Sequence, residues 1–171
     1  ATITGGGNVS YAWAFGDGTS GSGANTTHTY GAVGVYTAIV TASNGVNSLT
    51  ATTPVTITDV PVAGLSATND SPTALGQPTA FAATVTGGSN VSYAWDFGDS
   101  QTGSGANPTH TYAAGGVYLA TVTASNGTNA LQATTCVTVE TPISGLQAAN
   151  DSPVPVGQPV DFAATVAGGD N

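Results

Sequence analysis

The chain has 171 residues and a formal net charge of −9, because it carries 9 acidic residues and no lysine or arginine. A surface without cationic side chains cannot neutralise phosphates, which excludes nucleic-acid binding through a basic patch and docking on anionic lipid. No apolar run approaches the roughly 20 residues that a spanning helix needs, so we expect no membrane insertion in this segment.

An internal repeat organises the sequence. The stretch "NVSYAWAFGDGTSGSGANTTHTYGAVGVYTAIVTASNG" begins at Asn8 and recurs from Asn90 as "NVSYAWDFGDSQTGSGANPTHTYAAGGVYLATVTASNG". The stretch "AGLSATNDSPTALGQPTAFAATV" from Ala63 recurs from Ser144 as "SGLQAANDSPVPVGQPVDFAATV". One structural unit is therefore present twice, together with a fraction of a third copy.

The repeat divides the chain into three segments. We expect residues 1–58 to lack the first strand and most of the second, residues 59–141 to be complete, and residues 142–171 to hold the first two strands of a further unit. Either the chain, which starts without a methionine, is a window cut from a longer array, or residues 142–171 of one copy complete residues 1–58 of the next by strand addition. Both explanations predict a linear head-to-tail assembly with other copies or neighbouring repeats.

Strand periodicity is clear in "VSYAWDF" and "VYLATVTAS" of the second copy. Alternation places two sets of side chains on inward faces: Val91, Tyr93, Trp95 and Phe97 in the first strand, and Tyr118, Ala120, Val122 and Ala124 in the second. Asp96 faces outward in this pattern. Gly-, Asn- and Pro-rich turns separate the strands, and about seven short strands per unit indicate an immunoglobulin-like sandwich.

The motif "YAWDFGDS", followed by "HTYAAGGVYLATVTASNG", resembles the polycystic-kidney-disease (PKD) domain. The first copy departs from the family motif at Ala14 and the second at Ser100. The resemblance implies an all-β fold of tandem immunoglobulin-like, PKD-type β-sandwiches in an extracellular or cell-surface protein. The expected structural core includes Trp13 and Trp95, buried in equivalent cores, and Tyr36 and Tyr118, also in equivalent positions.

The four residues "DFGD", from Asp96 to Asp99, spell a kinase-like magnesium motif. Phosphoryl transfer also needs a lysine, and the chain has none, so this interpretation is rejected. We expect Asp17 and Asp99 to cap the turn after the tryptophan strand by accepting backbone N–H bonds. No nucleotide or other cofactor is expected.

Calcium is the one metal left open. Some PKD-like domains bind calcium near their loops, and the resemblance makes Asp96, Asp99, Asn69 and Asp70 conceivable oxygen ligands. An EF-hand-like density of Asp and Asn is absent, so turn capping and solvation are the favoured roles of these side chains.

Histidine, cysteine and asparagine motifs do not form a catalytic set. His28 and His110, each in "HTY", are interpreted as structural, with the nearby tyrosine bonding across a loop corner. Cys136, which replaces Pro54 of the first copy, is expected to be a small buried or half-buried hydrophobe. Asn-x-Ser/Thr triplets leave glycosylation open, and they begin at Asn8, Asn25, Asn69, Asn90, Asn126 and Asn150.

These features favour non-catalytic structural or adhesive repeat modules of a large extracellular surface or filament-forming protein. The alternative is a spacer or accessory module of a secreted protease or polysaccharide hydrolase. A dedicated carbohydrate-binding module fits less well, because both tryptophans fall on the inward face and leave no flat aromatic platform. Expected partners are other copies or neighbouring repeats, with cell-surface glycans or proteins as further candidates.

Overall fold

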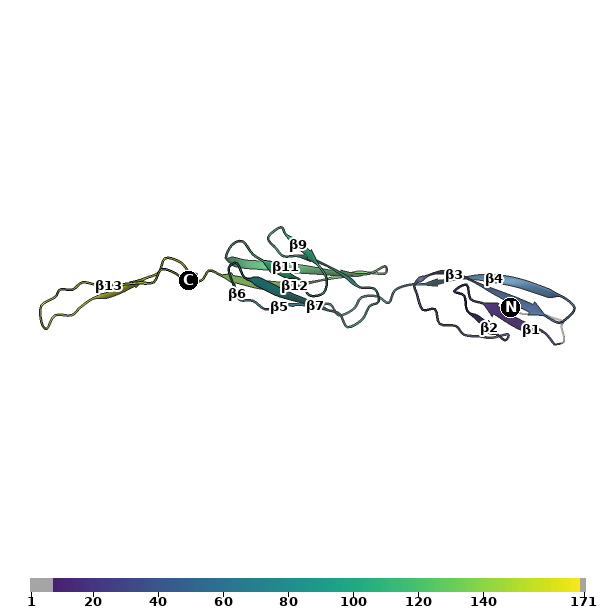
Figure 1. The fold of residues 1–171 in the computed structure, drawn as a ribbon. Coiled ribbons are helices and arrows are strands. Elements are labelled where there is room, and N and C mark those ends of the chain that lie inside the picture. Colours follow the sequence, from purple (N-terminus) through teal and green to yellow (C-terminus); the bar gives the residue numbers. More distant parts are fainter. Residues whose placement is uncertain (1–7, 170–171) are drawn as a thin grey trace. The chain divides into compact units, whose positions relative to one another are not determined.

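The computed structural model describes residues 8–169, and every regular element in this range is a β-strand (Figure 1). The expected all-β fold is confirmed. Residues 1–7 and 170–171, which the segment boundaries predicted above include, lie outside the described residues. The chain divides into two compact units, Ala1–Asp59 and Val60–Asn171. The boundary predicted at residue 141 lies inside the second unit and stays a prediction.

The described part of the first unit is a single antiparallel sheet with the strand order β2-β1-β3-β4. Its strands are β1 (Ser10–Ala14), β2 (Ser20–Ser22), β3 (Gly34–Ser43) and β4 (Ser48–Ile57). Asn44 closes the β3–β4 hairpin, because its side-chain oxygen accepts the N–H groups of Val46 and Asn47. Pro54 lies in β4, one of the two edge strands of this described sheet, opposite Thr37.

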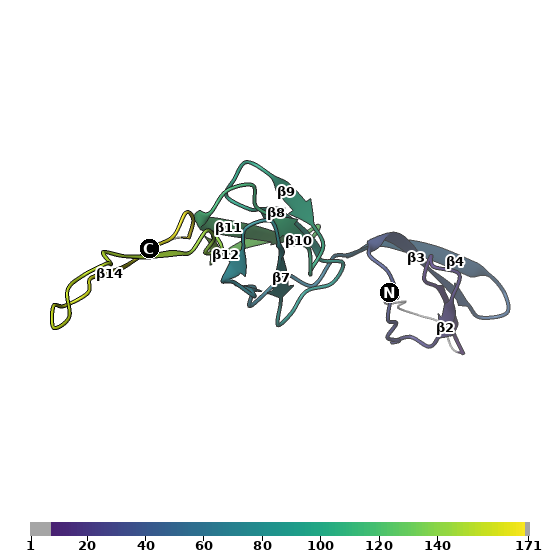
Figure 2. The same ribbon diagram turned by 60° about the vertical axis from the view of Figure 1, so that its left-hand side comes forward.

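The second unit contains a complete two-layer sandwich (Figure 2). One sheet has the order β10-β7-β5 and the other β6-β12-β11-β8-β9; among the described residues of this unit, only the β12–β6 pair is parallel. The strands are β5 (Ser66–Asn69), β6 (Thr73–Ala74), β7 (Pro78–Thr84), β8 (Ser92–Asp96), β9 (Thr102–Ser104), β10 (Thr109–Thr111), β11 (Gly116–Ser125) and β12 (Ala130–Glu140). A separate hairpin pairs β13 (Gln147–Asn150) with β14 (Phe162–Thr165).

Aromatic and β-branched side chains from both sheets form the core of this sandwich. Phe81 of β7 lies 5.1 Å, between ring centroids, from both Trp95 and Phe97. Val122 and Val137 are completely buried beneath them. The Trp95 indole N–H donates to the Gly105 carbonyl at 3.0 Å, so its polar atom is satisfied inside the core.

The alternation predicted from the sequence is confirmed in the second copy. Trp95 is 1% exposed and faces the core from β8, whereas its neighbour Asp96 is exposed. Trp95 lies opposite Val122 of β11, whose inward residues are buried or, at Tyr118, half-buried against the core. A period of two places these side chains on one face because successive residues of a strand point to opposite sides.

Burial of Trp13 in an equivalent core is not observed. Trp13 keeps the indole bond, donating to the Gly23 carbonyl at 3.1 Å, but its side chain is only half-buried. Among residues 8–59 no second sheet provides a counterpart of Phe81. The prediction is therefore wrong for the first copy, because one sheet of a sandwich can cover only part of an inward-facing indole. Tyr36 is half-buried, as is its counterpart Tyr118 in the second copy, so the predicted equivalence of these two positions is not contradicted.

No helix that could cross a bilayer occurs in the described range.

Candidate functional site

An aromatic corner lies where the tryptophan strand ends in the second copy. The Phe97 ring stacks on the His110 imidazole with centroids 4.2 Å apart and planes 2° from parallel. The Tyr112 ring meets this imidazole edge-on, with centroids 4.6 Å apart, and its centroid lies 4.1 Å from that of Tyr118. The His110 Nε2 atom lies 2.7 Å from a carboxylate oxygen of Asp99.

Backbone turns hold the members of this corner in place. Gly98 adopts a φ of +83°, and a Cβ there would lie 2.6 Å from the Leu119 carbonyl oxygen, so the turn requires glycine. Asp99 accepts the N–H of Gln101 at 3.0 Å, which is a turn-capping bond. The Tyr112 hydroxyl donates to the Phe97 carbonyl at 2.9 Å, and Tyr112 is 1% exposed.

The first copy contains the same corner. His28 Nε2 lies 2.6 Å from Asp17 and its ring stacks on Phe15 at 4.2 Å. The Tyr30 hydroxyl donates to the Phe15 carbonyl at 3.0 Å. Asp17 accepts both the N–H of Thr19, at 3.0 Å, and its hydroxyl, at 2.6 Å. The aspartate, the histidine and the tyrosine thus hold the same positions in both copies.

The surroundings of the two aspartates change their acidity. The hydrogen bond from the Thr19 hydroxyl, followed by that from His28, lowers the pKa of Asp17 to about 2. Burial alone would raise the pKa of Asp99, but the bonds from His110 and from the Gln101 N–H outweigh it and lower the pKa. Burial, with smaller contributions from Asp99 and Tyr118, raises the pKa of Tyr112 to about 12. Both carboxylates are therefore held in the ionised form.

Thr19, His28 and Asp17 bring a hydroxyl, an imidazole and a carboxylate together, which is the composition of a hydrolase triad. In a triad the nucleophile and the carboxylate bond opposite nitrogens of the imidazole, so the carboxylate orients the ring while the ring takes the proton of the nucleophile. Here the Thr19 hydroxyl and the Asp17 carboxylate both contact Nε2, at 3.2 and 2.6 Å. The second copy has Gln101 at the place of Thr19. The geometry is that of a structural clamp.

Comparison with known proteins identifies the repeat. The PKD domain family matches residues 1–57 and 64–139. The chain belongs to this family. Human polycystin-1 is 32% identical over 176 residues, an alignment that covers 99% of this chain and 4% of polycystin-1. The chain therefore corresponds to a small part of that protein.

The chain was also compared with solved structures. The amphioxus IgVJ-C2 molecule matches 80% of this chain, with 92% of its own length covered, a TM-score of 0.54 and 14% sequence identity. The N-terminal four immunoglobulin domains of Dscam1 isoform 1.9 match 78% of the chain and 38% of their own length, at a TM-score of 0.42 and 16% identity. The first of these likenesses supports the immunoglobulin-like fold.

The four oxygen-bearing residues considered for calcium have internal hydrogen bonds in the second PKD domain. Asp96 accepts the Gly98 N–H at 2.9 Å, and Asp70 accepts the Ala80 N–H at 2.8 Å. Asn69 accepts the Ser71 N–H and donates to β12, while Asp99 bonds His110 as described above. No group of three or more His, Cys, Asp or Glu side chains that could hold a metal occurs in residues 8–169.

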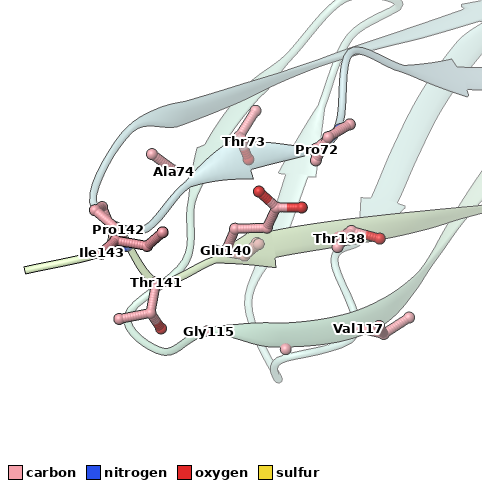
Figure 3. A pocket seen from close by; sticks show the side chains of 12 residues that line it. Pro72, Thr73, Ala74, Gly115, Val117, Thr138, Glu140, Thr141, Pro142 and Ile143 are labelled. Carbon is pink, nitrogen blue, oxygen red and sulfur yellow. The ribbon is translucent and has the colours of Figure 1, made fainter. Parts of the chain in front are cut away.

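An open groove of about 620 Å³ lies beside the end of β12 in the same unit (Figure 3). Glu140 is the one titratable side chain among its lining residues, and Thr73 and Thr138 add hydroxyl groups. A lone carboxylate without a histidine, cysteine or second acid has no partner for acid–base or nucleophilic chemistry. The groove therefore supplies no catalytic set.

Cys136 is exposed, which corrects the expectation of a buried or half-buried position. Val137 and Val139 take the inward positions of β12, so the alternation turns Cys136 outward. The sequence predicted a structural histidine and tyrosine at a loop corner. It did not predict that the histidine bonds Asp99 or that the tyrosine donates to the Phe97 carbonyl. It also did not single out Tyr112 as a core residue, although its place in "HTY" was the available signal.

Proposed function

We propose that these PKD domains are non-catalytic structural or adhesive modules of a larger extracellular or cell-surface protein, arranged head to tail. The observation that carries this proposal is the repetition of one structural corner in both copies, with the Asp–His and Tyr–carbonyl bonds retained. An enzyme needs one competent site, whereas a spacer or stalk needs the same rigid unit many times. The corner serves rigidity, since each of its polar groups bonds within its own domain.

The composition supports an extracellular role in adhesion or spacing. Without lysine or arginine, the exposed surface is neutral or acidic, so nonspecific attraction between modules is weak. Rigid modules of this kind hold other parts of a protein at a distance and present their loops to proteins or glycans. We also propose that the exposed loops are glycosylated.

Localisation and architecture test the proposal together. Antibodies against this segment should label the native protein on intact, unpermeabilised cells, and the intact protein should show a mass of several repeats. Electron micrographs should show beaded rods or filaments. Labelling only after permeabilisation would contradict the extracellular role, and a catalytic domain in the native protein would favour the spacer of a secreted hydrolase instead.

A further inference from the structure

Six Asn-x-Ser/Thr triplets occur in the sequence, and the folded domains use the polar groups of most of them. N-linked glycosylation attaches a sugar to the asparagine amide of such a triplet, whose third residue must supply a hydroxyl group. Transfer to a folded chain therefore requires an amide and a hydroxyl that are not bonded within the domain. The hydrogen bonds of each triplet show which of them meets this requirement.

The amides of Asn69 and Asn126 are structural groups of the second domain. Asn69 donates to a hydroxyl and to a carbonyl of β12, at 2.7 and 2.8 Å. Asn126 donates to the carbonyls of Val60 and Ser89, at 2.7 and 2.9 Å. A sugar on either nitrogen would replace one of its two N–H donors, so one bond of each pair would be lost. Asn150 repeats Asn69 in the next unit, and we assign it the same structural role.

The triplets that begin at Asn8 and Asn90 have hydroxyl groups that are already bonded. Their third residues, Ser10 and Ser92, are the first residues of β1 and β8. The Ser10 hydroxyl donates to a carbonyl of β3 at 3.1 Å, and the Ser92 hydroxyl donates to a carbonyl of β11 at 3.0 Å. Both triplets therefore lack a free hydroxyl in the folded domains.

The remaining triplet, "NTT" at residues 25–27, lies in a loop that is anchored at both ends. Before it, the Gly23 carbonyl accepts the indole N–H of Trp13 at 3.1 Å. After it, the Tyr30 hydroxyl donates to the Phe15 carbonyl at 3.0 Å. Between these anchors, neither the asparagine amide nor the hydroxyl of the third residue bonds another group among residues 8–169.

The complete second domain shows how this loop lies when both sheets are present. Asn107 stands there in the place of Asn25. The carbonyls on either side of it, those of Ala106 and Pro108, accept two N–H groups of β7 at 2.8 and 2.9 Å. Asn107 itself is exposed, and its amide bonds no other group in the described range. This place in the repeat is therefore on the surface of an intact domain.

One residue distinguishes the two copies at this place. The second copy reads "NPT" at residues 107–109, and proline in the middle position abolishes the acceptor. The first copy has Thr26 at the position of Pro108, which leaves its triplet competent. Two domains with the same fold and the same loop anchors thus differ in one requirement for glycosylation.

We infer that Asn25 carries an N-linked oligosaccharide and that the equivalent loop of the second domain carries none. The inference rests on the proposed extracellular role and names the glycosylated loop. In the transfer, the Asn25 Nδ2 atom forms a bond to the anomeric carbon of an oligosaccharide carried on an isoprenoid pyrophosphate. The bond from that carbon to the pyrophosphate breaks, and the pyrophosphate leaves with the electron pair. The amide proton passes to a base of the transferring enzyme.

Mass spectrometry tests the site on the native protein and on the whole chain secreted from eukaryotic cells. Peptide N-glycosidase should remove one oligosaccharide from the wild-type chain, and release in heavy-oxygen water should label position 25 alone. Asn25→Gln and Thr27→Ala should each abolish the attached mass. Thr26→Ala is the matched control and should keep it, because the middle position accepts any residue except proline.

The second domain provides a test by gain of a site. Pro108→Thr restores the triplet of the first copy and should add a second oligosaccharide, attached at position 107. If circular dichroism shows that this variant unfolds, Pro108→Ala replaces it, since it creates an acceptor triplet as well. Asn126→Gln should leave the attached mass unchanged and lower the melting temperature, because it removes the bonds to Val60 and Ser89.

Three outcomes would overturn the inference: a native protein without N-linked sugar, a sugar at a position other than 25, or a folded Pro108→Thr chain without a second sugar. A sugar at Asn8 or Asn90 would contradict the assignment to Asn25 and leave the proposal of glycosylated loops intact. Surface labelling of intact cells is measured independently of all these results, so failure of the inference and failure of the proposed function remain distinguishable.

Discussion

At the scale of single residues, one substitution between the copies explains why two equivalent carboxylates differ. Asp17 and Asp99 each bond a histidine and a backbone N–H two residues further on. Asp17 additionally accepts the hydroxyl of Thr19, where the second copy has Gln101. This extra bond is the largest contribution to the pKa of about 2 at Asp17.

Replacing Thr19 by valine should therefore raise the pKa of Asp17 toward the ordinary aspartate value of 3.8, measured by carbon NMR of the carboxyl group. Asp99 in the same spectra is the internal control. A carboxylate whose pKa is lowered by folding contributes stability that is present above its unfolded pKa and lost as the pH falls through its folded pKa. The wild type should thus lose stability between about pH 4 and 2, and Thr19→Val should lose less. An unchanged Asp17 titration would contradict this account.

Tyr112→Phe should destabilise the second domain by about 1 to 3 kcal/mol, because it leaves the Phe97 carbonyl without its buried donor. Tyr30→Phe removes the equivalent bond in the first copy, where the tyrosine is half-buried and water can reach the carbonyl. Tyr30→Phe should therefore reduce the stability of its domain by clearly less. Urea denaturation, followed by hydrogen exchange in each domain, measures the stability that each variant loses. Equal losses would show that burial of the carbonyl does not set the cost.

We expect the melting temperature to be the same in calcium and in excess chelator. Asp96, Asp99, Asn69 and Asp70 already bond backbone or side-chain groups, and a ligand that bound only the folded state would have to stabilise it. Magnesium serves as the matched divalent control. A calcium-specific rise in melting temperature would revive the metal site and assign it to these loops.

At the scale of strands and sheets, the sequence predicted local pattern well and tertiary burial less well. Alternation identified the inward faces of β8 and β11, because period-two patterning depends only on neighbours along the chain. It could not distinguish Trp13 from Trp95, since the two strands have nearly the same sequence and differ in what lies opposite. The His110–Asp99 bond was not predicted either, because it joins residues 11 positions apart and strand alternation reports only on neighbours along the chain.

Comparing the two tryptophans measures how much stability the opposing sheet contributes. Trp95→Ala should cost about 3 to 5 kcal/mol, as large buried aromatics do. Trp13→Ala removes the same side chain from the same place in the repeat, but at a half-buried position, and should cost markedly less at concentrations where the chain is monomeric. Chemical denaturation of both variants provides the comparison. Equal costs would show that Trp13 is packed as tightly as Trp95.

At the scale of the whole molecule, stability should be uneven along the chain. The core of the second domain contains seven side chains that are at most 1% exposed: Thr79, Trp95, Tyr112, Ala120, Val122, Ala124 and Val137. Among residues 8–59 the most buried side chain, Ala38, is 4% exposed, and the strands of the final hairpin are exposed throughout. Local opening costs least where little apolar surface is buried.

Hydrogen exchange in dilute solution should therefore show three levels of protection. Amides of β11 and β12 should exchange slowest, those of β3 and β4 faster, and those of β13 and β14 fastest. Peptic fragments resolved by mass spectrometry measure each segment, and pepsin is suitable because the chain has no tryptic site. Uniform protection across the three segments would indicate a single cooperative unit.

Pro54 in the edge strand β4 leaves a gap in the backbone donors that this edge offers to another strand. An exposed edge strand is a template for unlimited sheet growth, and proline interrupts the row of donors that such growth requires. At the equivalent position of the second copy, Cys136 lies on a strand whose neighbouring edge is partly covered by β6 and bonded by Asn69. Pro54→Val would add a backbone donor to this edge strand, and the variant should form fibrils that bind thioflavin faster than the wild type.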